Sequence, residues 1–349
     1  MTTRKIELEK IALRTLKAER IAVFPHTGAD GDCLGAGSAL REALTSVGVY
    51  ATVVVDAPVV SRYKFLPFSD EAVVYNEDDP QGFMRSVVGS DTADLAILVD
   101  CSIPERIGNC SVLLDMCDER AVIDHHFSET CSVKFCCIDD QASSTGELIF
   151  DFIESLEVLT GKKIFSRSIA VNILAAIYFD TGGLRYSNTT SKAFDICGRL
   201  FREFSPDLRE IVYNIFEKTS KSKICIQSKA FSLIEYYENS RIAVCKLTGP
   251  MINECGADDD DMDGICTSIK NVEGVEVAFV LRERNENEVR GNIRSSELFD
   301  ASKLASSFGG GGHRRAAGFT VTNMSIEEIG RIIVTMSIEK IRSGQDGSK

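Results

Sequence analysis

The chain has 349 residues, of which 44% are hydrophobic and 26% are charged, the balance of a globular protein long enough for two domains. Its formal net charge of −13 excludes the strongly basic surface of a protein that binds long duplex DNA, and so favours a short anionic partner. The apolar runs are too short to span a membrane, and the N-terminal segment lacks a secretory signal. We therefore expect a cytoplasmic protein with no membrane partner.

The first 130 residues alternate between predicted helices and predicted strands. Residues 4–19 carry apolar side chains at helical spacing among charges, which predicts an amphipathic helix. After it, the expected strands are 21–24, 51–55, 95–99 and 121–123, and the expected helices are 37–47 and 81–88. This alternation indicates an α/β fold, in which flanking helices cover a parallel sheet.

The rest of the chain predicts a helical segment and then a smaller α/β domain. Residues 141–220 look mainly helical, with a turn at Thr181, Gly182 and Gly183, and a polar hinge follows at 217–223. Strand-like runs come next at 241–247, 275–281 and 289–294, followed by a glycine-rich turn at 309–312 and a helix near 325–341. We expect a first domain at 1–216, a linker at 217–230 and a second domain at 231–345, with the active-site cleft between the domains.

Cysteine usage bears on both the compartment and metal binding. The twelve cysteines are scattered and form no Cys-x-x-Cys pair; the closest grouping is Cys131, Cys136 and Cys137. Cytosolic thiols are normally reduced, and a zinc ribbon needs paired spacing. We therefore expect buried or partly buried free thiols.

Candidate metal ligands directly follow three of the predicted strands. They are His26, Asp30 and Asp32 after the first strand, Asp100 after the third, and Asp124, His125 and His126 after the fourth. Because ligands bind at the carboxyl ends of strands in open α/β sheets, we expect these side chains to share one edge. Carboxylate and imidazole together suit divalent metals such as Mn²⁺. Taken singly, each cluster also has a simpler interpretation, as a solvated turn or a helix cap.

Two further clusters lie outside the predicted strands. Asp180 precedes a Thr-Gly-Gly turn and Arg185, which is also the pattern of a helix that ends at glycine. The glycines at 309–312 precede His313 and two arginines. Exposed backbone N–H groups, a following helix N-terminus and these cations would all attract phosphate, whereas a flexible turn is the alternative. All four histidines of the chain fall in these clusters, which favours a single site over scattered structural histidines.

In this order, the motifs resemble the DHH phosphoesterase superfamily, in the two-domain form with a DHHA1 C-terminal domain. The namesake triplet is Asp124-His125-His126, and the glycine turn ending at Gly318 resembles the DHHA1 signature. Residues 185–190 and the compact length resemble its nanoRNase and pAp-phosphatase branch, the NrnA-type oligoribonucleases. Ala29 and Ala36 depart from the usual Pro and Ser of the family, at positions that supply no ligand.

The resemblance implies a hydrolase with two divalent metal ions, most naturally Mn²⁺, with Co²⁺ or Mg²⁺ as alternatives. One ion would be held by His26, Asp30 and Asp100. The other would be held by Asp32, Asp100, His125 and Asp180, so that Asp100 bridges both. His126 would face the scissile phosphate, and Asp124 would orient an imidazole. The implied substrate contacts are Arg185, Arg294, Gly310, Gly311, Gly312, His313 and Arg314.

The same resemblance implies the class of substrate. We expect short oligoribonucleotides (nanoRNA) that are cut to mononucleotides, or the small nucleotide pAp that is converted to AMP. One alternative is the hydrolysis of pApA, the linear product of cyclic di-AMP. Another is a nucleotide-sensing module that has lost activity, although the intact set of six proposed ligands argues against it. The sequence leaves a homodimer open.

Overall fold

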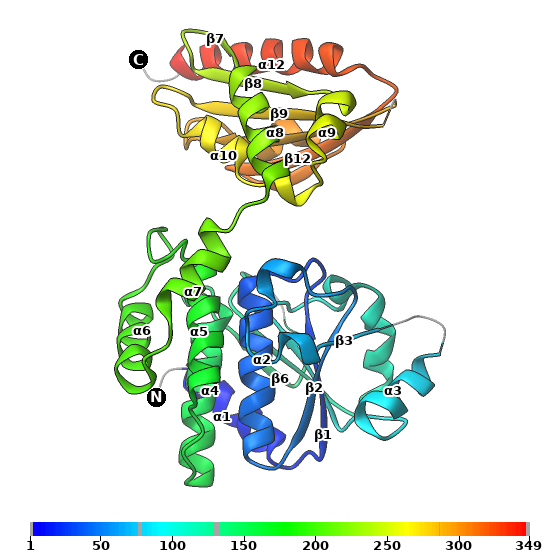
Figure 1. Ribbon diagram of the computed structural model, residues 1–349, viewed down its shortest axis with the longest axis vertical. Helices are drawn as coiled ribbons and strands as arrows, with labels where there is room; N and C mark the ends of the chain where they lie inside the picture. The colour runs from blue at the N-terminus through cyan, green and yellow to red at the C-terminus, as the bar shows by residue number, and fades with distance from the viewer. Residues whose placement is uncertain (1–2, 76–78, 129–130, 132, 286, 347–349) are drawn as a thin grey trace. The chain divides into compact units, whose positions relative to one another are not determined.

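A computed structural model describes residues 3–75, 79–128, 131, 133–285 and 287–346, and Figure 1 shows its helices and strands. The chain divides into two compact units, Met1–Lys218 and Thr219–Lys349. Each unit has a six-stranded sheet and a hydrophobic core of its own. The α/β fold class predicted from the sequence is therefore confirmed in both halves of the chain.

The sheet of the first unit consists of parallel strands in the order β3-β2-β1-β4-β5-β6. These strands are β1 Arg20–Pro25, β2 Tyr50–Val55, β3 Val73–Val74, β4 Leu95–Val99, β5 Arg120–Asp124 and β6 Phe135–Ile138. The four predicted strands are confirmed as β1, β2, β4 and β5, with ends that differ by at most one residue. The sequence pattern missed β3 and β6, because a run of two or four residues is too short to show a period.

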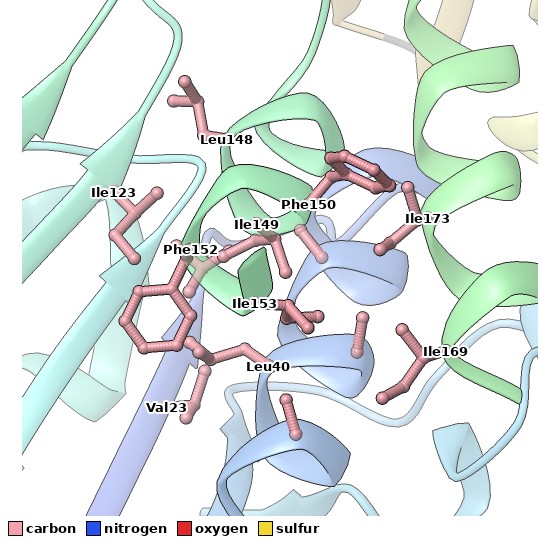
Figure 2. Close-up of a cluster of buried hydrophobic side chains, with 14 of the residues drawn as sticks. Val23, Leu40, Ile123, Leu148, Ile149, Phe150, Phe152, Ile153, Ile169 and Ile173 are labelled. Atoms are coloured by element: carbon pink, nitrogen blue, oxygen red, sulfur yellow. The ribbon is translucent and has the colours of Figure 1, made fainter. Parts of the chain in front are cut away.

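Helices cover both faces of this sheet. The helices of this unit are α1 Thr3–Thr15, α2 Gly31–Ser46, α3 Pro80–Val88, α4 Thr145–Thr160, α5 Arg167–Asp180, α6 Ser191–Phe204 and α7 Leu208–Val212, of which α6 and α7 pack on other helices. Alternate residues of β1 face opposite ways: Val23 packs with α1, α2, α4 and α5, whereas Phe24 packs with α3 and the 3-10 segment Pro104–Met116. Figure 2 shows side chains of β1, β5, α2, α4 and α5 pointing into one cluster.

The start of α2 differs from the prediction, which placed this helix at 37–47. The helix begins at Gly31, because the Asp30 carboxylate caps it by accepting hydrogen bonds from the backbone N–H groups of Asp32 and Cys33. A loop rich in glycine and aspartate therefore becomes a helix N-terminus. As a result, Asp32 lies in the first turn of α2, where it is fully buried.

The second unit has a mixed sheet in the order β11-β12-β10-β9-β8-β7, in which only the β8–β9 pair is parallel. Its strands are β7 Glu235–Tyr237, β8 Ile242–Leu247, β9 Val277–Asn285, β10 Glu288–Ser295, β11 Gly311–His313 and β12 Ala316–Thr322. Its helices are α8 Lys221–Ser232, α9 Gly249–Cys255, α10 Ile265–Lys270, α11 Ala301–Ser306 and α12 Ile326–Asp346. Among the described residues, no helix combines the length and the apolar character needed to cross a membrane.

The segment predicted as a linker, 217–230, is largely helical. Most of it belongs to α8, which begins where the Ser220 hydroxyl accepts a hydrogen bond from the backbone N–H of Lys223. Ile226 and Ala230 are fully buried in the core between this helix and the second sheet. Polar composition suggested a hinge here, but these two apolar residues, four positions apart, give the helix a buried face.

The glycine-rich turn also differs from the prediction, because no helix follows it. Gly311–His313 forms β11, which pairs with β12 in a hairpin. The glycines permit close packing of the two strands. A Cβ on Gly310 would lie 2.2 Å from the Gly318 carbonyl oxygen, and Gly312 has a φ of +138° and a similarly close neighbour. Steric fit between strands therefore accounts for part of the glycine run.

The prediction that all cysteines are free is wrong for four of them. Cys131 is bonded to Cys136, and Cys225 to Cys255. The second pair joins α8 to the end of α9, with Cα atoms 5.5 Å apart despite a separation of 30 residues. Sequence spacing could not show that these two helices pack side by side. The eight other cysteines are free, and seven of these are buried.

The close packing of α2 against α5 can be tested at a helical glycine. A Cβ on Gly35 would lie 2.5 Å from the backbone carbonyl oxygen of Asn172 in α5. Gly35→Ala should therefore push the helices apart and lower the free energy of unfolding by about 1–3 kcal/mol. Gly198→Ala is the control, because its new Cβ would meet nothing within 4 Å.

The control should raise the free energy of unfolding by up to about 1 kcal/mol, because alanine has the higher helix propensity. Urea unfolding followed by circular dichroism measures both variants. Equal effects of the two substitutions would contradict the close approach of α2 and α5.

Candidate metal centre

The candidate ligands lie at the carboxyl ends of neighbouring strands. β1 pairs with β2 on one side and with β4 on the other, so the strand order reverses between β1 and β4. Such a switch point is where open α/β sheets bind ligands. His26 follows β1, Asp100 follows β4, and Asp124 is the last residue of β5. The structure therefore places these side chains at the edge where the sequence predicted them.

Asp100 lies between two groups of candidate ligands. Its Oδ2 is 3.3 Å from His26 Nε2, and its Oδ1 is 3.5 Å from His125 Nε2. The residue is 1% exposed and has a φ of +62°, a left-handed conformation that is uncommon for any residue other than glycine. Each carboxylate oxygen thus faces a different histidine.

The first group contains His26, Asp30, Cys33 and Asp100, whose candidate ligand atoms all lie within 4.8 Å of one another. His26 Nε2 is 3.5 Å from Asp30 Oδ2. His26 Nδ1 is 2.8 Å from the carbonyl oxygen of Thr27, to which it can donate a proton. This bond leaves Nε2, the nitrogen that would bind a metal ion, facing the carboxylates. Cys33 was not predicted at the site.

The second group contains Asp32, His125 and Asp180. His125 Nε2 lies 2.9 Å from Asp180 Oδ2 and 3.7 Å from Asp32 Oδ2. Its Nδ1 faces the carbonyl oxygen of Ala142 at 3.4 Å. Despite the short distance to Asp180, the buried Nε2 has no partner with hydrogen-bond geometry. The orphaned nitrogen is what a missing metal ligand bond would leave.

Asp124 and His126 form a pair beside these groups. Asp124 Oδ1 accepts a hydrogen bond from the backbone N–H of His126 and lies 2.9 Å from its Nδ1. The His126 side chain is 44% exposed, whereas that of His125 is 11% exposed. The two histidine rings, whose centroids lie 4.5 Å apart, thus differ in exposure, and Asp124 holds the more exposed ring.

The N-terminus of α4 completes the site, and the sequence did not single it out. The backbone N–H groups of Thr145 and Gly146 donate to the two oxygens of Asp32, at 2.7 and 2.9 Å. The Thr145 hydroxyl donates to Asp100 Oδ1 at 2.7 Å. A helix N-terminus stabilises negative charge. The pattern Ser144-x-x-Glu147, typical of a capping box, was the available signal for a helix start here.

Crowding among the aspartates favours the protonated forms of Asp32 and Asp180 when no cation is present. Burial raises the pKa of Asp32 well above its usual value, and repulsion from Asp100, Asp180 and Asp30 raises it further. Burial and neighbouring carboxylates raise the pKa of Asp180 as well. Burial alone would lower the pKa of His125, but the Asp180 carboxylate and its neighbours raise it to about 9.

The donor set fits divalent cations. Carboxylate oxygens outnumber the imidazoles, the suitable histidine nitrogens point inward, and the repulsion among the carboxylates would be offset by positive charge. Asp100 presents one oxygen to each of the two groups.

The predicted substrate contacts are divided between the two units. Arg185 lies in the first unit, where its Nε donates to the Gly182 carbonyl oxygen at 2.5 Å and its guanidinium stacks on Phe216. The second unit carries Arg294 in β10, His313 in β11 and the hairpin turn that follows. That turn contains Arg314, whose Nη2 donates to the Glu297 carbonyl oxygen at 3.3 Å. Contact between these residues and a substrate stays a prediction.

Family models match both units. The DHH family N-terminal domain matches residues 20–178, and the DHHA1 domain matches residues 239–337. The chain belongs to the DHH/DHHA1 phosphoesterase superfamily, in its NrnA-type branch. This family assignment makes the chain a phosphate-ester hydrolase.

Related proteins agree with this assignment. The bifunctional oligoribonuclease and PAP phosphatase NrnA of Thermus thermophilus is 26% identical over 97% of this chain and 96% of that protein. A probable enzyme of the same name from Streptococcus mutans is 26% identical over 88% of this chain and 92% of that protein. The cyclic-di-AMP phosphodiesterase PdeA of Listeria monocytogenes is 23% identical over 91% of this chain but 47% of its own length.

Solved structures share the fold. An exopolyphosphatase-related protein from Bacteroides fragilis is similar with a TM-score of 0.83 and 22% identity, over 98% of this chain and 96% of that one. The exonuclease RecJ, in a structure bound to manganese, has a TM-score of 0.52 and 14% identity, over 92% of this chain and 90% of that one. The fold of this chain is therefore similar to folds already seen in solved structures.

The raised pKa values predict how the stability of metal-free protein depends on pH. A histidine whose pKa is raised by folding stabilises the protein below its unfolded pKa of about 6.5. This stabilisation is lost as the pH rises through the folded value, about 9 for His125. The raised pKa values of Asp32 and Asp180 act in the same direction, because the folded protein keeps protons that the unfolded chain releases.

The melting temperature of EDTA-treated protein should therefore fall between about pH 6 and about pH 8.5. With excess Mn²⁺ the fall should disappear or reverse, because metal competes with protons for the same side chains. Differential scanning fluorimetry at matched ionic strength measures both series. A metal-free protein whose melting temperature does not change across this range would contradict the proposed crowding.

Proposed function

We propose that the chain is a metal-dependent phosphoesterase that hydrolyses short oligoribonucleotides to mononucleotides and converts pAp to AMP. The observation that carries the proposal is the position of Asp100, whose two oxygens face two groups of histidine and aspartate side chains. Relatives named oligoribonuclease and PAP phosphatase that match nearly the full chain support the choice of substrate.

We further propose that the two groups hold a pair of divalent cations, most naturally Mn²⁺. His26, Asp30 and Asp100 would hold one ion. Asp32, Asp100, His125 and Asp180 would hold the other. Such ions lower the pKa of a water molecule and offset the charge that develops on phosphoryl oxygens. Inward-pointing Nε2 atoms and the manganese-bound RecJ structure of the same fold support this choice.

His126 and Arg185 would act on the substrate rather than on the cations. Asp124 engages His126 through Nδ1, so Nε2 of this half-exposed ring is the nitrogen that can face the substrate; in the imidazolium form it would donate to a phosphoryl oxygen or to the leaving group. The Gly182 carbonyl and the Phe216 ring hold Arg185 in place at the surface, five residues after Asp180. A fixed guanidinium binds phosphate with two parallel hydrogen bonds.

A second candidate is the hydrolysis of pApA. The similarity to the cyclic-di-AMP phosphodiesterase PdeA over 91% of this chain favours it. A metal centre of this kind would cleave pApA as well as a short oligoribonucleotide, since each contains a phosphodiester bond, whereas pAp presents a phosphate monoester. An inactive nucleotide sensor is less well supported, because all six proposed ligands are present and lie together.

Asp100→Asn tests the proposed bridging role. The amide keeps the shape of the side chain but loses the charge and one acceptor, so kcat/KM on pAp and on a diribonucleotide should fall by more than about 100-fold. Asp195→Asn, at an exposed position of α6, is the matched control and should leave kcat/KM unchanged. Product chromatography with Mn²⁺ separates AMP from both substrates.

Retained activity in Asp100→Asn would remove the basis of the proposal. If the wild-type protein with Mn²⁺ left pAp, pApA and short RNAs all intact, the sensor would be favoured instead. Faster cleavage of pApA than of the other substrates would select the second candidate.

The acidic surface predicts a preference for short chains. With a formal net charge of −13, most of the surface should repel the backbone of a long RNA. The initial rate per molecule should therefore be higher for a dinucleotide than for an RNA of about 24 nucleotides at low salt, where such repulsion acts over the longest range. Equal rates for the two lengths would count against a short substrate.

A further inference from the structure

Glu147 is a buried carboxylate outside both groups of candidate ligands. It lies in the first turn of α4 and is 1% exposed. Its Oε2 accepts hydrogen bonds from the Ser143 backbone N–H at 3.0 Å, the Ser143 hydroxyl at 2.8 Å and the Thr190 hydroxyl at 3.1 Å. Its Oε1 accepts from Arg4 Nη1 at 2.9 Å. Both oxygens are therefore fully engaged, by three separate segments of the chain.

Arg4 brings the N-terminal helix into this arrangement. It belongs to α1, before the residues that match the DHH family model. Its Nη2 contacts the Glu147 carbonyl oxygen at 3.2 Å and Asp151 Oδ2 at 2.7 Å, and its Nη1 contacts Asp139 Oδ2 at 3.3 Å. The side chain is 13% exposed, so these ion pairs are shielded from solvent screening. Arg4 thus joins α1 to the start of α4.

The turn that Glu147 holds, residues 143–146, is the turn that contacts the metal centre. Two backbone N–H groups of this turn bind the carboxylate of Asp32, and the Thr145 hydroxyl binds Asp100. Asn188 Nδ2 also donates to the carbonyl oxygens of Ser143 and Asp180, at 3.0 and 3.1 Å. The turn is therefore linked to segments that carry three of the proposed ligands.

We propose that Glu147 and Thr145 are positioning residues of the metal centre. Glu147, locked by Arg4, fixes the 143–146 turn, and this turn orients the carboxylates of Asp32 and Asp100 toward the cations. The inference rests on metal binding at the proposed site, and it adds a role for the N-terminal helix.

The physical reason is the demand on Asp100. A carboxylate that serves two ions must keep its plane fixed, because rotation about the Cβ–Cγ bond moves both oxygens at once. The Thr145 hydroxyl binds Oδ1, the oxygen that faces His125, and so opposes this rotation. Asp32 is held in the same way through both of its oxygens. Outer contacts of this kind normally tune metal affinity.

Thr145→Val is the sharpest test. Valine keeps the shape and the backbone N–H to Asp32 but removes the hydroxyl from Asp100. The dissociation constant for Mn²⁺, measured by isothermal titration calorimetry on the full chain, should rise by about 10-fold or more. Thr145→Ser restores the hydroxyl and should return the constant to near the wild-type value. Thr160→Val, at the last residue of α4, is the matched control and should have no effect, because this hydroxyl bonds only to the Leu156 carbonyl oxygen and the Lys162 backbone N–H.

Glu147→Gln tests whether the contacts of Glu147 hold the 143–146 turn in place. Its amide group presents N–H donors either to Ser143 and Thr190 or to Arg4, where donors already point at the side chain. The dissociation constant for Mn²⁺ should rise by about 10–100-fold. Glu154→Gln, at an exposed position of the same helix, should leave the constant unchanged.

A lower melting temperature with unchanged Mn²⁺ affinity in Thr145→Val would show a merely structural role and overturn the proposal. If Glu147→Gln does not fold, the comparison of Thr145→Val with Thr145→Ser still tests the proposal. The titration uses no substrate, so the two proposals fail separately. A wild type that binds Mn²⁺ but cleaves nothing refutes only the proposed function. An active wild type with unchanged affinity in Thr145→Val refutes only the positioning role.

Discussion

Mutual repulsion among Asp30, Asp32, Asp100 and Asp180 is the constraint on which the rest of the centre depends. Burial and this repulsion raise the pKa of Asp32 and of Asp180, so the groups are costly to keep ionised together. Positive charge at the site would therefore stabilise the arrangement. Several elements around the site compensate this negative charge.

The N-termini of two helices compensate part of the negative charge. Asp30 caps α2, and the first two backbone N–H groups of α4 bind Asp32. Backbone dipoles therefore offset negative charge without any cationic side chain that could compete with a metal ion for the carboxylates. With a metal ion in place of the Nε2 proton, the two histidines would be neutral ligands, each held by a carbonyl oxygen on its far side. Divalent cations would balance the negative charge of the carboxylates that these groups do not offset.

The contacts of Glu147 at the start of α4 show the same compensation of a buried charge, one layer further from the centre. Glu147 is itself a buried negative charge close to a site that already has too many. Its charge is balanced by Arg4 and by three donors, and its pKa stays below the usual value even though burial alone would raise it. The pair thus adds rigidity to the turn without adding a net charge. Stability of the first unit and geometry of the centre are therefore coupled through one turn.

Local sequence patterns were enough to predict the α/β class, the main strands and the candidate ligands of the metal centre, because each of these has a short-range signature in the chain. Apolar runs that end in His26, Asp100 or Asp124 identify strands and the edge at which they stop, and four histidines confined to motifs identify one site. The family resemblance drew on the same local motifs.

Contacts between segments far apart in the chain are visible only in the folded molecule. The bond from Arg4 to Glu147 spans 143 positions, and the disulfide between Cys225 and Cys255 joins two helices whose packing no local pattern reveals. The glycines at 309–312 were interpreted as a loop before a helix, but the carbonyl oxygen of Gly318 on the partner strand explains why one of them, Gly310, lacks a side chain. Local sequence periodicity reports which face of an element is buried, whereas the identity of the partner depends on how the whole chain folds back on itself.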